Sequence, residues 1–226
     1  MNDTLRTIWN GFDFSYLLEI VLGIIPSLLC ITLHELAHGY TAYRLGDDTA
    51  KRAGRLTLNP LKHLDPIGLL MMLVFHFGWA KPVPVNMRNF KNPKQGMAIT
   101  ALAGPLCNLL ITLVFLVLYG LLYKPLSGSD FGGRLLGMIS LTAYMSLGLC
   151  LFNLLPVPPL DGSKVLFSLL PDSAYVKLMQ VERYGSLLLL LLVWTGILGK
   201  PFSRLIQTVF SWLFPIAEAV FHLVNG

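Results

Sequence analysis

The chain has 226 residues, of which 54% are hydrophobic and 13% are charged, and its mean hydropathy is +0.65. Soluble domains carry about 25% charged residues, so this composition excludes a disordered chain, a nucleic-acid-binding domain and an ordinary soluble enzyme. The formal net charge of +5 does not indicate a nucleic-acid partner, because the basic residues gather between long apolar blocks. These blocks predict an integral membrane protein.

Four apolar segments predict membrane-spanning helices, since crossing a bilayer takes about 20 mainly apolar residues. They cover residues 16–45, 97–123, 135–155 and 176–197. The first is too long for a signal peptide and has no small-residue cleavage site after it, so we expect it to stay in the mature protein.

Two further apolar stretches predict other placements. Residues 67–78 are too few to span, which indicates a re-entrant or protein-packed segment. Residues 202–224 are amphipathic and predict a helix that lies in the membrane interface.

The loop charges predict the orientation. Residues 46–96 hold eight lysines and arginines, whereas residues 124–134 hold two. The positive-inside rule therefore places residues 46–96 on the cytoplasmic side and the N-terminus outside.

The first predicted span contains His34-Glu35-Leu36-Ala37-His38, an HExxH motif. Residues four apart share a face of a helix, so both imidazoles can bind one metal ion, with Glu35 beside it as a general base for a bound water. A chain of this composition would contain the motif by chance about 0.002 times. His34 also lies about 15 Å into the bilayer, where ionisable residues are functional by default. A pair of core histidines is the weaker interpretation.

A catalytic zinc site usually takes three protein ligands and a water. The candidates for the third ligand are His63, His76, His222, Glu182 and Asp161. His63 and His222 have the surroundings of surface or interfacial residues, and His76 is a stronger rival. Asp161 follows three prolines that end the third span, where broken backbone must line a cavity or be buried in protein. A turn or the start of a short helix at 163–170 explains Asp161 equally well by spacing alone.

These motifs resemble the site-2 protease family of intramembrane zinc metalloproteases, in its small prokaryotic form without a PDZ or CBS domain. HELAH and the Asn153–Gly162 segment with its Leu-Asp-Gly carry the resemblance, together with residues 58–68, 79–86 and 103–108. It covers roughly residues 16–170. The resemblance implies that His34, His38 and Asp161 bind one zinc ion with Glu35 as base, and it favours Asp161 over its rivals.

The same resemblance suggests that Asn153 stabilises the oxyanion or positions the peptide, although an interhelical hydrogen bond would also satisfy its amide. Asn108, one helical turn after Gly104-Pro105, has the same two interpretations, and a structural role is favoured for it. Gly104 is expected to let helices approach closely.

Residues 79–86 cannot form a helix, because their prolines confine them to an irregular or edge strand. They are either a simple loop or an edge onto which an unwound substrate adds as a strand, and the resemblance favours the second. The remaining polar pairs, Asp47-Asp48 and Glu182-Arg183, are expected to be solvated or interfacial charges. Cys30, Cys107 and Cys150 lack metal-binding spacing and are expected to be core thiols.

Together these inferences predict an all-α polytopic membrane protein with a three-helix catalytic core, additional helices and a small extended or β element on the cytoplasmic side. Residues 1–226 form one membrane-embedded domain in this interpretation. The resemblance implies a zinc metalloprotease in a prokaryotic plasma membrane, open to the cytoplasm. It would cleave a transmembrane segment of a membrane-protein substrate, with an upstream protease or a regulatory membrane partner. The alternatives are a protease with Glu182 as third ligand, and a non-enzymatic membrane or metal-handling protein.

Overall fold

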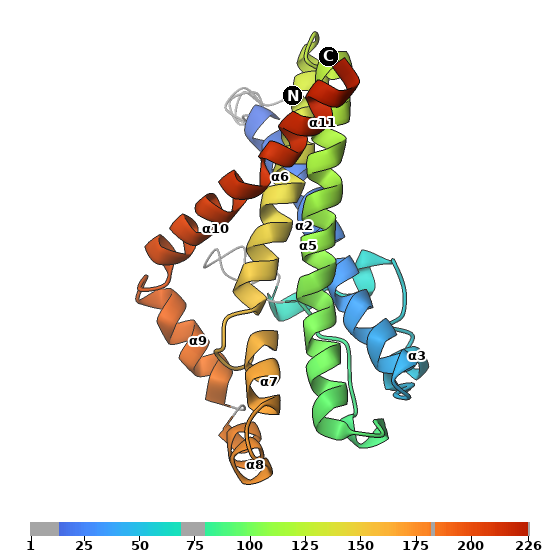
Figure 1. Cartoon of the computed structure of the whole chain (residues 1–226), viewed down its shortest axis with the longest axis vertical. Helices are drawn as coiled ribbons and strands as arrows, with labels where there is room; N and C mark the ends of the chain where they lie inside the picture. The colour runs from blue at the N-terminus through green and yellow to red at the C-terminus, as the bar shows by residue number, and fades with distance from the viewer. Residues whose placement is uncertain (1–13, 69–79, 182–183, 226) are drawn as a thin grey trace, which may run out of the picture.

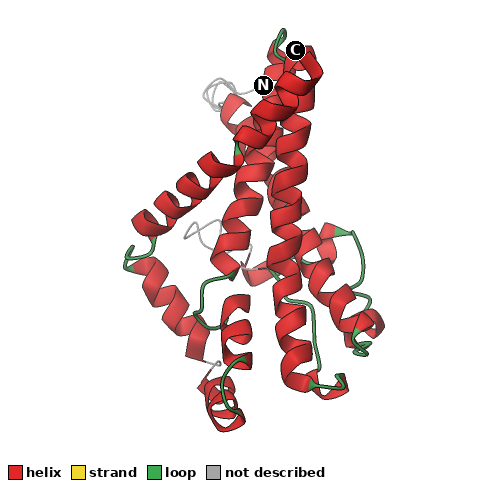
Figure 2. Cartoon of the chain, in the orientation of Figure 1, coloured by secondary structure: helices red, strands yellow, loops and turns green. Residues whose placement is uncertain are grey.

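The computed structural model describes residues 14–68, 80–181 and 184–225, and most of that chain is helical (Figures 1 and 2). In chain order the helices are α2 (Phe14–Arg44), α3 (Thr49–Arg52), the short 3₁₀ helices η1 (Pro60–Lys62) and η2 (Met87–Asn89), α5 (Pro93–Leu126), α6 (Asp130–Asn153), α7 (Asp161–Ser168), α8 (Asp172–Val181), α9 (Gly185–Trp194), α10 (Gly199–Leu213) and α11 (Pro215–Asn225).

Three long helices, α2, α5 and α6, pack against one another and form the centre of the molecule (Figure 1). α2 has 31 residues, which is about 46 Å of helix against a hydrocarbon thickness of about 30 Å. α5 and α6 are both long and apolar enough to cross a membrane. The three helices cover the predicted spans 16–45, 97–123 and 135–155 to within two residues at their ends, so the expected three-helix core is present.

The C-terminal part has helices in both of the apolar stretches predicted there. Of the expected span 176–197 the structure describes α8 and α9, on either side of residues 182–183, which lie outside the described part. α9 has 10 residues, about 15 Å of helix. By length and composition, α10 and α11 together, Gly199–Asn225, make a third segment long and apolar enough to cross a membrane, whereas the sequence favoured an interfacial helix.

The C-terminal helices α10 and α11 pack against α5 and α6, beside the C-terminal end of α5. α11 packs along the last turns of α5, and α10 contacts α6 (Figure 1). Leu116, Ala143 and Ala217 are the buried centre of this contact, and the partly buried side chains packed around them are Phe115, Tyr119, Phe210, Leu213 and Phe214. This apolar cluster ties α5 and α6 to the C-terminal segment.

The predicted small β element is not formed as a strand. Within residues 14–68 and 80–181 the only bridge is an isolated antiparallel one between Leu64 and Ala80. Residues 81–86 form no regular secondary structure. The residues before Pro82 and Pro84 are confined to extended backbone, and the two prolines supply no N–H group for a ladder; we call residues 81–86 the extended segment. The short apolar segment 67–78 falls almost entirely outside the described residues.

Candidate metal centre

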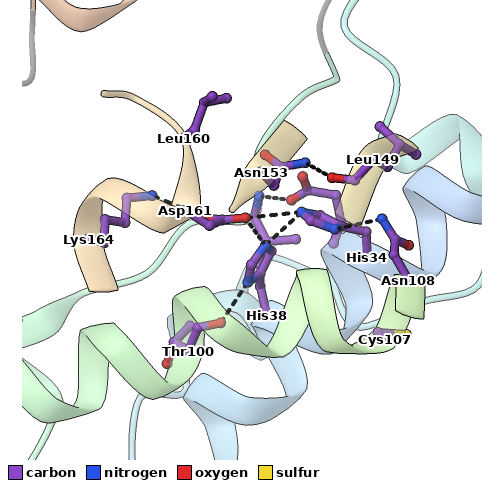
Figure 3. A network of polar contacts seen from close by, with 12 residues as sticks. His34, His38, Thr100, Cys107, Asn108, Leu149, Asn153, Leu160, Asp161 and Lys164 are labelled. Atoms are coloured by element: carbon purple, nitrogen blue, oxygen red, sulfur yellow. Dashed lines mark hydrogen bonds and ion pairs between the residues drawn. The ribbon is translucent and has the colours of Figure 1, made fainter. Parts of the chain in front are cut away.

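Helix α2 brings His34 and His38 together. They stand one turn apart on the same face, as the HExxH spacing predicts, and only 7% and 9% of their surfaces are exposed. Their Nε2 atoms lie 2.9 Å apart. Both rings point toward the start of α7 (Figure 3).

Asp161 reaches the two rings because the chain breaks after α6. α6 ends at Asn153, a proline-rich loop follows, and α7 begins with Asp161 itself. Its Oδ2 atom lies 3.2 Å from Nε2 of His34 and 3.1 Å from Nε2 of His38. The short helix that could have explained Asp161 as a turn residue therefore exists, but its first side chain faces the histidines.

These three side chains fit a zinc ion. In a tetrahedral site with metal–ligand bonds of about 2.0–2.1 Å, neighbouring ligand atoms stand about 3.3–3.4 Å apart. The three observed separations are within a few tenths of an ångström of that value. The donor set, two imidazoles and one carboxylate, is also one that zinc prefers. Among the residues that the structure describes, this is the one cluster with metal-binding geometry.

Helix α5 forms the wall behind the histidines. Nδ1 of His38 lies 2.7 Å from the carbonyl oxygen of Thr100, which can accept the ring's N–H. Gly104 faces both rings: a Cβ atom there would lie 2.6 Å from Cε1 of His34 and closer still to the His38 ring. This confirms the predicted close approach at Gly104.

A cavity of about 370 Å³ opens beside the three side chains. Glu35, Asn153 and Lys164 contribute its polar lining, and Pro82 and Val83 of the extended segment form another side. Glu35 accepts a hydrogen bond through Oε2 from the backbone N–H of Val83 at 2.8 Å. The predicted base therefore lies at the cavity and contacts the predicted substrate edge.

The other sequence candidates have different surroundings. Asn153 lines the cavity, although its Nδ2 also donates to the carbonyl of Leu149 within α6. Asn108 is fully buried and faces His34. His63 was expected at the surface, but it is 1% exposed, and its Nε2 lies 2.9 Å from the carbonyl oxygen of Thr57. His222 is on α11, away from the cluster. His76 and Glu182 lie outside the described residues.

Lys164 and Thr100 were missed by the sequence interpretation. Lys164 is one turn after Asp161 on α7, and its Nζ lies 3.8 Å from Oδ1 of Asp161. The i, i+3 spacing after a predicted ligand was the available signal. Thr100 acts through its backbone carbonyl, so its side-chain type carried no signal.

Asp47 was expected to be solvated and is instead completely buried. Its carboxylate accepts hydrogen bonds from the backbone N–H of Thr49 and Asn86 and from the Asn89 side chain. Burial alone would raise the pKa of this carboxyl, but these hydrogen bonds outweigh it and hold the pKa below its ordinary value. Asp48 does pair with Arg52 in a half-exposed ion pair. The cysteines are free, with Cys30 and Cys150 buried, as predicted.

The fold and the site define a class of protein. Two imidazoles and one carboxylate converge in a helical membrane protein, next to a second carboxylate and an open cavity. This arrangement is that of a metal-dependent hydrolase.

Comparison with known proteins gives the family. The pattern of peptidase family M50 matches residues 123–194, which include Asn153 and Asp161. YwhC of Bacillus subtilis, provisionally named a zinc metalloprotease, is 44% identical over 75% of this chain and 78% of its own. Rip2 of Mycolicibacterium smegmatis, with the same provisional description, is 30% identical over 99% and 82%. The zinc metalloprotease MJ0392 of Methanocaldococcus jannaschii is 27% identical over 91% and 50%. No solved structure shows a significant match.

The chain therefore belongs to peptidase family M50, the site-2 protease family. It is a zinc metallopeptidase of the membrane, and zinc is its cofactor.

Proposed function

We propose that this chain is an intramembrane protease that cleaves a peptide bond within or next to a transmembrane segment of another membrane protein. His34, His38 and Asp161 would hold one zinc ion, and Glu35 would be the general base. The observation that carries the proposal is the meeting of Nε2, Nε2 and Oδ2 within 3.2 Å, beside Glu35 and an open cavity.

A zinc ion held by these residues would supply a Lewis acid that polarises the scissile carbonyl and lowers the pKa of a water. Glu35 would take a proton from the water that attacks the scissile carbonyl carbon. As the C–N bond breaks, Glu35 delivers the proton to the leaving amine nitrogen. Oε2 of Glu35 is held by Val83, and Oε1 has no hydrogen bond within the described residues, which leaves it available for the proton.

In this proposal the extended segment, residues 81–86, binds the substrate. The N–H of Lys81 donates to the carbonyl of His63 and the N–H of Val83 donates to Glu35, so both N–H groups point toward the protein. Alternation then turns Pro82 and Pro84 outward, and both are exposed. Prolines have no N–H group. The free edge therefore offers only carbonyl acceptors, and a substrate strand would bind it through its own N–H groups.

The partners and the location follow from the same proposal. The substrate would be a single-span membrane protein, trimmed first by an upstream protease or presented by a membrane partner. The cavity would open to the cytoplasm of a prokaryotic plasma membrane, since the loop that carries the extended segment is the basic one.

The test combines zinc content with substrate accumulation. Wild type is expected to purify with one zinc per chain, Asp161→Ala with none, and Glu35→Gln with one. Membranes of cells carrying Glu35→Gln should accumulate uncut single-span proteins that wild type removes. If Asp161→Ala keeps its zinc, the assigned ligand set is wrong. If a substrate is cut equally by Glu35→Gln, the assigned base is wrong.

A further inference from the structure

One face of helix α5 packs against the rings of His34 and His38. Thr100, Gly104 and Asn108 are each four residues apart and therefore share a face. α5 runs antiparallel to α2 (Figure 1), so Thr100 meets His38 and Asn108 meets His34. Gly104 lies between them, where a side chain would strike both rings.

At His38 this face fixes which ring nitrogen carries the proton. Nδ1 lies 2.7 Å from the Thr100 carbonyl oxygen, which can only accept. Nδ1 must therefore be the protonated nitrogen, and Nε2 keeps its lone pair toward Asp161 and His34. Metal-binding histidines usually have such a partner on the other ring nitrogen.

At His34 the corresponding partner is the side chain of Asn108. Its Nδ2 lies 3.1 Å from Nδ1 of His34, while its Oδ1 is buried and has no hydrogen-bond partner among the described residues. A half-turn of the amide exchanges Oδ1 and Nδ2 within the same volume. In that orientation Oδ1 accepts the N–H of Nδ1, and Nε2 of His34 is free for a metal.

The turn that carries Asn108 is anchored independently of its side chain. The hydroxyl groups of Ser146 on α6 and Thr112 on α5 both donate to the Asn108 backbone carbonyl, at 2.8 and 3.0 Å. Asn108 itself is fully buried and does not line the cavity. Its amide therefore faces the back of the His34 ring and not the space that a substrate would enter.

We propose that Asn108 is a positioning residue, which accepts the Nδ1 proton of His34 and so orients that ring for zinc. The inference rests on the proposed function, since it assumes that His34 binds the metal. It differs from the role expected by resemblance, because Asn108 acts on a ligand and not on the oxyanion or the peptide.

The experiment measures zinc affinity of the full chain in detergent, by competition with a chelator of known affinity. Asn108→Leu removes the acceptor at similar volume and should weaken zinc binding about 10- to 100-fold. Asn108→Asp keeps an oxygen that can accept from Nδ1 and should remain within about threefold of wild type. Thr142→Val is the control, because this buried hydroxyl on α6 donates only to the carbonyl of Met138 in its own helix, and it should bind zinc as wild type does. Asn108→Ala gives a second measurement should Asn108→Leu fail to fold.

The outcomes separate this inference from the proposed function. Equal affinity in wild type and Asn108→Leu would overturn the role of Asn108 but leave the zinc site standing. An equal loss in Asn108→Leu and Thr142→Val would overturn it too, since core packing would then explain both. A wild-type chain that binds no zinc even when it is supplied would instead overturn the proposed ligand set. A change in the visible spectrum of the cobalt-substituted protein in Asn108→Leu, absent in Asn108→Asp, would support the inference without any activity measurement.

Discussion

Adding one methyl group at Gly104 should empty the metal site without unfolding the helix that carries it. In Gly104→Ala the new Cβ would lie 2.6 Å from Cε1 of His34 and nearer to the His38 ring. Non-bonded carbon atoms rest about 3.5 Å apart, so a ring or the whole helix must move by about 0.9 Å. Metal–ligand distances tolerate only about 0.2 Å. The displacement is several times the tolerance.

The stability terms at this position nearly cancel. Alanine is favoured over glycine inside a helix by about 1 kcal/mol, whereas overpacking costs about 1–3 kcal/mol. Gly104→Ala should therefore remain folded, with a loss of about 0–2 kcal/mol before any contribution from zinc. Its zinc affinity should fall at least 100-fold, beyond the range seen when only an outer partner of a ligand is lost.

The assay is zinc per chain by elemental analysis, with helix content by circular dichroism on the same samples. Gly137→Ala is the matched control, because it places the same methyl group on the neighbouring helix α6, where nothing lies within 4 Å of the new atom. Gly104→Ala should lose its zinc and keep its helices, and Gly137→Ala should keep both. A Gly104→Ala protein with one tightly bound zinc would refute the argument that α5 sets the space for the rings.

Three further predictions use other close contacts. In Gly162→Ala the Cβ would lie 2.7 Å from the carbonyl oxygen of Leu155, so Asp161 should shift and zinc content should fall, whereas Gly128→Ala, in open space, should keep its zinc. In Gly120→Ala the Cβ would lie 3.0 Å from Cβ of Val220, so α11 should separate from α5 at a cost of about 1–3 kcal/mol, seen as a lower melting temperature with unchanged zinc. Asp47 has a lowered pKa in the folded chain, so its stabilising effect is complete above the unfolded pKa of about 3.9 and is lost as the pH falls through the folded value. The protection of the backbone amides of residues 80–89 against hydrogen exchange, relative to an unfolded chain at the same pH, should accordingly fall in acid for wild type. Asp47→Asn should show lower protection already at pH 7 and no such acid step.

The sequence predicted the residues of the candidate site that lie in two short motifs, HELAH and the Asn153–Gly162 segment. The two histidines are four residues apart, and helix geometry alone places them on one face. Spacing left Asp161 undecided, and the resemblance to a known family favoured it. The structure brings its carboxylate to both rings. By contrast, Thr100 contributes a backbone atom, and Lys164 is a common residue whose proximity depends on how α7 packs.

The C-terminal region shows that apolar length alone is a weak guide to membrane spans. Leucines make residues 187–192 the most apolar run of the chain, and the described helix there has 10 residues. Residues 199–225 are longer and are interrupted by polar side chains and a proline, so their amphipathic pattern favoured the interface. By length and composition, however, α10 and α11 together are long and apolar enough to cross a membrane.

The burial of Asp47 could not be predicted from the residues around it in the sequence. Two aspartates after a helix normally face water. Asp47 is buried because Asn86 and Asn89, which follow it by 39 and 42 positions in the sequence, donate hydrogen bonds to its carboxylate. Such a contact leaves no mark in the neighbouring sequence. Glu35 and Asp47 belong to the same stretch of chain, one within α2 and the other just beyond its end, and each binds a backbone N–H of the extended segment, at Val83 and Asn86. The edge proposed to bind substrate is thus held at two points by the chain that carries the histidines, so its distance from the metal site is set by α2 and not by the long loop that precedes it.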